Sequence, residues 1–173
     1  MMSPLNLAQL VANTGPDGQI FYGRLSKIDQ AYDETGRPVT HYNFFAEQCL
    51  KKCVSRSEVS MTVIGHASGE GQVLHGLTYL KNVGQQGLFF VAAPSRLGLS
   101  QFVALSQGHF LQDNKGELSN GLPTAVVLKH LNQLSATKHL TASIQILGRK
   151  KMTMPKQELL QVTQQLVRDI YAQ

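Results

Sequence analysis

Cysteine and histidine are the residue types in this sequence that could supply a nucleophile and a base. A cysteine nucleophile needs a base to form the thiolate and a third group to orient that base, so Cys49 with His75 and Asp113 is one conceivable triad. The segment FFAEQCLKKC has no papain-like signature, and its cysteines equally suit a core-facing element. A cysteine-dependent hydrolase or effector using Cys49 is therefore the least favoured function, and we predict no catalytic residues.

The same cysteines could instead be counted as metal ligands, because Cys49, Cys53, His66 and His75 offer four donors. Their spacing is not a standard zinc pattern, and the two histidines lie on separate predicted strands, whereas tetrahedral sites usually use tight knuckles. We therefore expect neither a metal nor another cofactor. Without a secretory signal, the two cysteines are expected to be reduced, buried thiols rather than a disulfide.

Basic and aromatic residues are interleaved in two neighbouring segments, IFYGRLSK and HYNFF. Single-stranded nucleic acids are bound by cations that follow the phosphates and by aromatic faces on which bases stack. Side-chain alternation places Tyr22 and Arg24 on one face of a strand, which is the minimum that such a site needs. The alternative is that these rings belong to the core, since only one set of them can face solvent. The nucleic-acid-binding residues predicted in this hairpin are Tyr22, Arg24, Lys27, Tyr42 and Phe44.

Further cations lie outside the hairpin. Lys81 follows it along the chain, and LGRKKMTMPK places Arg149, Lys150 and Lys151 at the entry to the last predicted helix. Cations at a helix start oppose the helix dipole, so an anionic partner or simple solvation must offset their repulsion. We predict that all four contact nucleic acid and extend one basic surface, with a solvated helix end as the alternative.

The elements that would position these residues fall into two halves. A short helix is expected after Ser3 and Pro4, followed by a hairpin from Gln19 to about Glu47 whose second strand could pass into a helix near Ala46. Three more strand candidates, EVSMTVIGHA, VLHGLTYLKN and GLFFVAAPS, complete a β-rich half over residues 18–95. Residues 96–173 are predicted to be mainly helical, with helical spacing in LGLSQFVALSQGHFL and LPTAVVLKHLNQL, one strand near 140–147 and a final amphipathic helix.

The order GRLSKIDQAYDETGRPVTHYNFFAEQ resembles the opening hairpin of bacterial single-stranded DNA-binding proteins, with matching places at Gly23, Arg24, Leu25, Gly36, Val39, Phe44 and Ala46. EVSMTVIGHA and YLKNVGQQGLFFVAA are similar to that family's middle strand, short helix and next strand, matching at Tyr79, Leu80, Lys81 and Gly84. The resemblance covers residues 18–95 and implies an OB-type barrel with affinity for single strands. The chain departs from the family in lacking tryptophan and in carrying a basic helical half instead of a glycine-rich acidic tail.

Length and composition set the remaining bounds. The 173 residues, 42% of them hydrophobic, suffice for one domain over residues 1–173, and no linker separates the halves. A formal net charge of +5 favours polyanionic partners, and no segment has the length of a membrane-spanning helix or the character of a signal peptide, so we expect a cytoplasmic protein without membrane contact.

We therefore predict an α+β fold, with an OB-like or strongly curved antiparallel β-half followed by a helical C-terminal half. The predicted function is a non-catalytic module of a replication, repair or mobile-element system that binds single-stranded nucleic acid. The alternative ranked next is an adaptor or assembly subunit that binds a protein partner through residues 96–173. Association into a homo-oligomer is left open.

Overall fold

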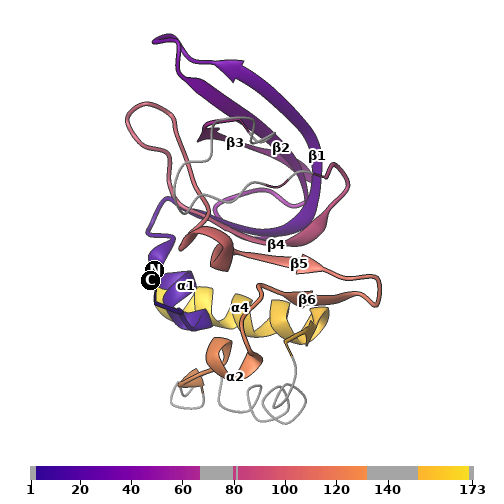
Figure 1. Cartoon of the computed structure of the whole chain (residues 1–173). Helices are drawn as coiled ribbons and strands as arrows, with labels where there is room; N and C mark the ends of the chain where they lie inside the picture. The colour runs from indigo at the N-terminus through magenta and orange to yellow at the C-terminus, as the bar shows by residue number, and fades with distance from the viewer. Residues whose placement is uncertain (1–2, 67–79, 81, 132–151, 172–173) are drawn as a thin grey trace.

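The computed structural model describes residues 3–66, 80, 82–131 and 152–171. Its centre is a seven-stranded antiparallel sheet in the order β3-β2-β1-β4-β5-β6-β7 (Figure 1). The strands are β1 (Gln19–Tyr32), β2 (Pro38–Lys51), β3 (Ser57–Ile64), β4 (Gln86–Val91), β5 (His109–Gln112), β6 (Glu117–Ser119) and β7 (Met154–Pro155). The helices are α1 (Leu7–Asn13), the 3-10 turn η1 (Leu105–Gly108), α2 (Thr124–Val127) and α4 (Lys156–Tyr171).

The β1–β2 hairpin is long and bent, and it dominates the sheet (Figure 1). Its register shifts at three places along β1: Ile20/Phe21, Tyr22/Gly23 and Leu25/Lys27. Such bulges bend a strand and increase its twist. Gly23 lies beside the second of them, where a Cβ atom would come within 2.0 Å of the Phe45 carbonyl oxygen. A side chain at this position would therefore push the two strands apart.

Each face of the sheet covers its own hydrophobic core. Because successive side chains of a strand point to opposite faces, β1 gives Ile20 to one core and Phe21 to the other. In the same way, β4 gives Leu88 and Phe90 to the first core and Phe89 to the second. The helices cover the first core, whereas the second is enclosed by the bent strands β1, β2 and β3 and by the chain near Phe102.

The two longer helices are fixed by separate signals. A capping box starts α1, in which the Asn6 side chain accepts from the Gln9 backbone and the Gln9 side chain accepts from the Asn6 backbone. Helix α4 is amphipathic and buries Leu159, Val162 and Leu166 against the first core. The two helices contact each other beside the sheet (Figure 1).

The predicted α+β class and the amphipathic final helix are confirmed. Most of the described helical residues lie in the second half, as predicted, but β5, β6 and β7 also extend the sheet there, which the sequence analysis did not predict. Residues 97–111 have helical spacing of apolar residues, yet they form a loop, η1 and β5, since Gly98 and Gly108 interrupt the segment and Phe110 pairs with Leu88. The strands predicted in VLHGLTYLKN and near 140–147 lie outside the described residues, apart from single positions of the first. Among the helices that are described, none combines the length and apolar character needed to cross a membrane.

Candidate nucleic-acid interface

The three rings predicted to stack on bases are buried. Tyr22 is 3% exposed, and Tyr42 and Phe44 are fully enclosed. Phe44 packs with Phe21 and Phe89 at ring-centre distances of 5.2 and 4.8 Å, and the Tyr42 hydroxyl donates to the Leu80 carbonyl oxygen at 2.9 Å. The predicted stacking role of these three residues is therefore wrong, because the face of β2 that carries Tyr42 and Phe44 is the core face and Tyr22 faces the helices.

The outward aromatic residue of β2 is Phe45, which the alternation places opposite Phe44. Phe45 is partly exposed and is the cross-strand neighbour of Arg24 on β1 and of Glu58 on β3. The Arg24 guanidinium lies over its ring, 4.6 Å from the ring centre. A cation and an aromatic ring thus lie together on the outer surface of the hairpin. Strand alternation indicates that only one of Phe44 and Phe45 can face outward, but it does not say which.

The two predicted hairpin cations face solvent, but each lies beside an acid. Arg24 Nη1 is 3.3 Å from a Glu47 carboxylate oxygen, and Lys27 Nζ is 3.3 Å from one of Asp29. The Arg24 and Lys27 side chains are 47% and 63% exposed. Ion pairs this exposed contribute at most about 1 kcal/mol, so either cation can exchange its carboxylate for a phosphate at small cost.

A second exposed ring lies at the far end of the same hairpin. Tyr32 is 68% exposed and meets the His66 ring edge-on, with 5.1 Å between ring centres. Just beyond it, the turn is fixed by Asp33, which accepts from the Thr35 hydroxyl and from the backbone N–H of Arg37. These hydrogen bonds lower the pKa of Asp33 to about 2, and Arg37 also pairs with its carboxylate at 2.8 Å. The sequence analysis did not include Tyr32 in the site.

The Tyr22 side chain links the sheet to the start of α4. Lys156 Nζ lies 4.7 Å from the centre of the Tyr22 ring, and the Tyr22 hydroxyl donates to the Gln112 side chain. Burial raises the pKa of Tyr22, and the nearby Glu47 carboxylate adds to that rise. The tyrosine is therefore a neutral structural contact, with a cation directly above it.

A shallow groove continues this surface between β2 and α4. It has a volume of about 350 Å³, its floor includes Leu160, and its polar lining consists of Gln48, Gln157, Gln161, Gln164, Gln165 and Arg168. Gln48 is the cross-strand neighbour of Tyr22, which precedes Arg24 by two residues on β1, so this end of the groove lies near the Arg24–Phe45 pair. Sequence reasoning missed this groove, because the glutamines become neighbours only when α4 packs beside β2.

Comparison with known protein families, with characterised proteins and with solved structures finds no match. The resemblance of residues 18–95 to single-stranded DNA-binding proteins therefore remains a prediction. The arrangement of the described side chains is what supports a functional interpretation.

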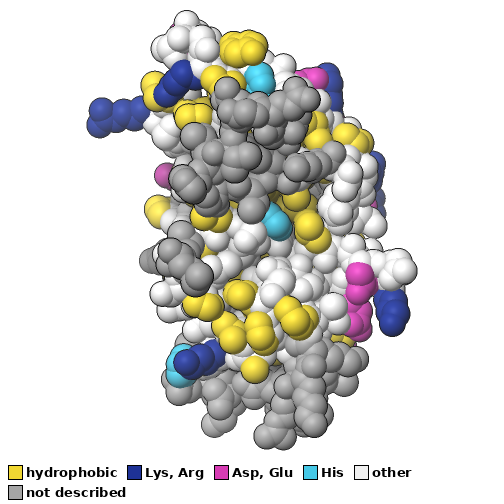
Figure 2. All heavy atoms as spheres, in the orientation of Figure 1, with side chains coloured by type: hydrophobic (Ala, Val, Ile, Leu, Met, Phe, Trp, Pro, Cys, Tyr) yellow, Lys and Arg dark blue, Asp and Glu magenta, His cyan; other side chains and the backbone are white. Residues whose placement is uncertain are grey.

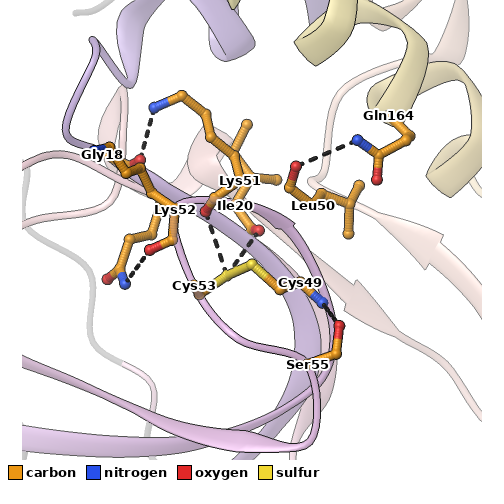
Figure 3. The surroundings of a disulfide bond; sticks show 10 residues. Gly18, Ile20, Cys49, Leu50, Lys51, Lys52, Cys53, Ser55 and Gln164 are labelled. Atoms are coloured by element: carbon orange, nitrogen blue, oxygen red, sulfur yellow. Dashed lines mark hydrogen bonds between the residues drawn. A yellow bond between two sulfur atoms is a disulfide. The ribbon is translucent and has the colours of Figure 1, made fainter.

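The predicted reduced thiols are a disulfide, which overturns that expectation. Cys49 and Cys53 are bonded across a tight loop at the end of β2, with 5.5 Å between their Cα atoms (Figure 3). Strand pairing with β1 ends at Lys51, and Lys52 has a positive φ of 58°, so the chain turns back and brings Cys53 to Cys49. A bonded Cys49 is neither a free nucleophile nor a zinc ligand, and the described residues contain no cluster of metal-binding side chains.

The disulfide loop is held from several sides (Figure 3). Gln164 of α4 donates to the Leu50 carbonyl oxygen at 3.3 Å, and the Cys49 N–H donates to the Ser55 hydroxyl at 2.8 Å. Cys53 Sγ lies 3.3 Å from the Lys51 carbonyl oxygen, a contact in which a disulfide sulfur has no hydrogen to donate. The loop thus joins β2 to α4 beside the groove lined by Gln48 and the glutamines of α4, which we call the glutamine groove.

The remaining predicted cations, Lys81, Arg149, Lys150 and Lys151, lie outside the described residues, as does His75 of the conceivable triad. On the face shown in Figure 2, the described lysine and arginine side chains lie apart from one another rather than in one patch. Among the described basic residues, Arg24 lies over the Phe45 ring, Lys27 follows it on β1, and Lys156 lies over the Tyr22 ring.

Proposed function

We propose that this protein is a non-catalytic module that binds single-stranded nucleic acid on the outer surface of the β1–β2 hairpin. The observation that carries the proposal is the Arg24 guanidinium lying over the ring of the partly exposed Phe45, 4.6 Å from the ring centre. Bases of single strands stack on aromatic rings and on the plane of arginine guanidinium groups. The pair offers such a plane beside a positive charge.

The charge balance supports the same proposal. The chain carries a net charge of +5, and Lys27 and Lys156 flank the Arg24–Phe45 pair along the hairpin surface. Phosphates would replace the Glu47 and Asp29 carboxylates, since exposed ion pairs of this kind are weak. A bent antiparallel hairpin with an exposed cation and ring also fits the OB-like architecture that we propose for the β-half.

The two alternatives find less support. An adaptor that docks through its C-terminal helices needs exposed apolar faces, but α4 uses Leu159, Val162 and Leu166 for its own core. A cysteine hydrolase needs a free thiolate at Cys49, and that sulfur is bonded to Cys53. Nucleic-acid binding is the function that uses the side chains on the outer face as they stand.

The test is fluorescence anisotropy of a labelled single-stranded DNA 20-mer at two salt concentrations. We expect binding that weakens as salt rises, because phosphate contacts release counterions. Arg24→Ala should reduce the salt slope by about one unit. Phe45→Leu, which keeps an apolar side chain but removes the ring, should weaken binding roughly fivefold or more, given about 1 to 3 kcal/mol per stacked base.

The matched control is Arg96→Ala, which removes an exposed arginine from the loop after β4. It should bind as the wild-type chain does, and thermal melting checks that every variant is folded. Absence of binding at low salt, or binding with no salt dependence, would overturn the proposal. Equal losses in Arg24→Ala and Arg96→Ala would show that only total charge matters and would overturn the assigned site.

A further inference from the structure

The glutamine groove is built from one stripe of α4 and one residue of β2. Residues 157, 161, 164, 165 and 168 recur at the spacing of a single helix face, and Gln48 faces them from the sheet. Over eleven residues this stripe extends for about 16 Å along the helix axis. Five of the six polar lining residues are glutamines, and the part of the chain that the structure describes contributes no carboxylate to the groove.

Three of these glutamines have amides available for a ligand. Gln164 Nε2 is used by the Leu50 carbonyl oxygen at 3.3 Å, and Gln165 Nε2 by an Asp169 carboxylate oxygen at 3.2 Å. Within the described part of the chain, the side chains of Gln48, Gln157 and Gln161 have no hydrogen-bond partner. Each free carboxamide presents a donor and an acceptor side by side.

The groove is also lined by one basic side chain, Arg168, near the C-terminal end of α4. Arg168 is exposed and forms no ion pair with the other described residues. At the other end of the helix, Lys156 lies above the Tyr22 ring. A nucleic-acid strand has negatively charged phosphates and bases whose edges carry hydrogen-bond donors and acceptors. A row of free amides between two cations is complementary to both.

We infer that this groove reads the bases of the bound strand and prefers adenine, an inference that rests on the proposed function. A carboxamide pairs in two places with adenine, donating to N7 and accepting from the N6 amino group. Guanine is typically read by arginine or lysine, and cytosine by a carboxylate that accepts from N4. Five of the six polar residues described in the lining are glutamines, none is a carboxylate, and the one cation, Arg168, is assigned to a phosphate, so adenine is the base that this lining fits best.

The strand reaches the groove directly from the hairpin surface. Gln48 pairs across the strands with Tyr22, and Phe45 pairs with Arg24, two residues further along β1. A nucleotide stacked at Phe45 therefore has its neighbour beside Gln48. In this arrangement Phe45 and Arg24 supply affinity, the free amides of Gln157 and Gln161 read the bases, and Arg168 takes a phosphate.

The experiment compares labelled oligo-dA, oligo-dT and oligo-dC of equal length at one low salt concentration. The wild-type chain should bind oligo-dA roughly fivefold or more tightly than the other two, the discrimination expected of one good two-point amide contact. The double variant Gln157→Ala, Gln161→Ala should bind all three about equally. Both substitutions are at exposed positions of α4, where alanine favours a helix, so the fold should be retained.

Two further variants separate the outcomes. Gln101→Ala removes an exposed glutamine away from the groove and should keep the adenine preference. Arg168→Ala should lower affinity for all three oligonucleotides and keep the preference, as expected for a phosphate contact. Equal binding of the three by the wild-type chain, or a preference that survives in the double variant, overturns the inference and leaves the proposed function standing. Absence of binding to every oligonucleotide overturns both.

Discussion

The Lys51 ammonium nitrogen lies 4.5 Å from the centre of the Tyr171 ring and thereby joins the end of β2 to the end of α4. The same nitrogen donates to the Gly15 carbonyl oxygen and, at 2.7 Å, to that of Gly18. The Tyr171 hydroxyl reaches the carbonyl oxygens at the end of α1, 2.8 Å from that of Ala12. Burial lowers the pKa of Lys51, yet the carbonyl oxygens and the ring keep the ammonium group partnered.

Replacing Lys51 by methionine should therefore lower the free energy of unfolding by about 1 to 3 kcal/mol, because two carbonyl oxygens lose their donor. Tyr171→Phe keeps the ring and removes one hydrogen bond, so its loss should be close to 1 kcal/mol. The measurement is urea unfolding followed by circular dichroism. Lys52→Met is the control, since Lys52 is 57% exposed and its nearest acid, Asp17, is 3.8 Å away. A loss in the control as large as that of Lys51→Met would contradict the proposed role of Lys51.

The buried ring of His109 should make the stability of the fold depend on pH. Neither of its ring nitrogens has a hydrogen-bond partner among the described residues, and its ring meets that of Phe102 edge-on at 5.1 Å. Burial lowers its pKa from 6.5 to about 4. Below pH 6.5 the unfolded chain binds a proton that the folded chain does not, so stability falls as pH falls and reaches its full loss near pH 4. The shift corresponds to about 3 kcal/mol.

This loss is measured as the difference between two proteins. The free energy of unfolding of the wild-type chain should decrease between pH 7 and pH 4 by about 3 kcal/mol more than that of His109→Leu, which cannot titrate. His41→Gln, which removes an exposed histidine of β2, should behave as the wild-type chain. Parallel pH profiles for wild type and His109→Leu would show that the His109 ring does not stay neutral in the folded state.

The Cys49–Cys53 disulfide should stabilise the fold although its loop is short. Closing a loop with a sequence separation of 4 removes conformational entropy from the unfolded chain worth about 2 kcal/mol. Addition of dithiothreitol, which supplies two electrons and two protons to form two thiols, should therefore lower the melting temperature. The double variant Cys49→Ser, Cys53→Ser should melt lower without reductant and should not respond to it. Two reactive thiols in protein denatured without reductant would contradict the disulfide itself.

Local patterns in the sequence predicted much of the fold. Ser3 and Pro4 predict a helix near the N-terminus, although its cap is Asn6, the apolar spacing of Leu159 and Leu166 predicts α4, and the turn around Gly36 closes the hairpin. These local patterns carry no information about which distant segments contact each other. Residues 109–112 form a strand because Phe110 pairs with Leu88, and no local signal distinguishes that pairing from the helical spacing of the same residues.

The site shows the same limit. Composition identified the hairpin, but it could not tell which face of β2 is buried, and the choice between Phe44 and Phe45 depends on that alone. The glutamines of α4 and Gln48 are more than a hundred residues apart and meet only through the packing of the first core. The disulfide was missed because the expectation of reduced thiols rested on the absence of a secretory signal. The chain turns back after Lys51, and this turn is what brings Cys53 to Cys49.

Glu47 provides the most direct test of the charge balance on the hairpin surface. Its carboxylate lies 3.3 Å from Arg24 and, after burial, is the second cause that raises the pKa of Tyr22. A negative charge in this place repels any phosphate that approaches the Arg24–Phe45 pair. Glu47→Gln should therefore strengthen binding of single-stranded DNA several-fold at low salt, an effect that fades as salt rises because the charge is exposed. The same variant should lower the pKa of Tyr22, which can be followed by ultraviolet titration of the phenol. Glu34→Gln, at the distant hairpin turn, is the matched control and should change neither quantity. Unchanged affinity together with a lowered Tyr22 pKa would show that Glu47 acts on the tyrosine but that the strand binds elsewhere.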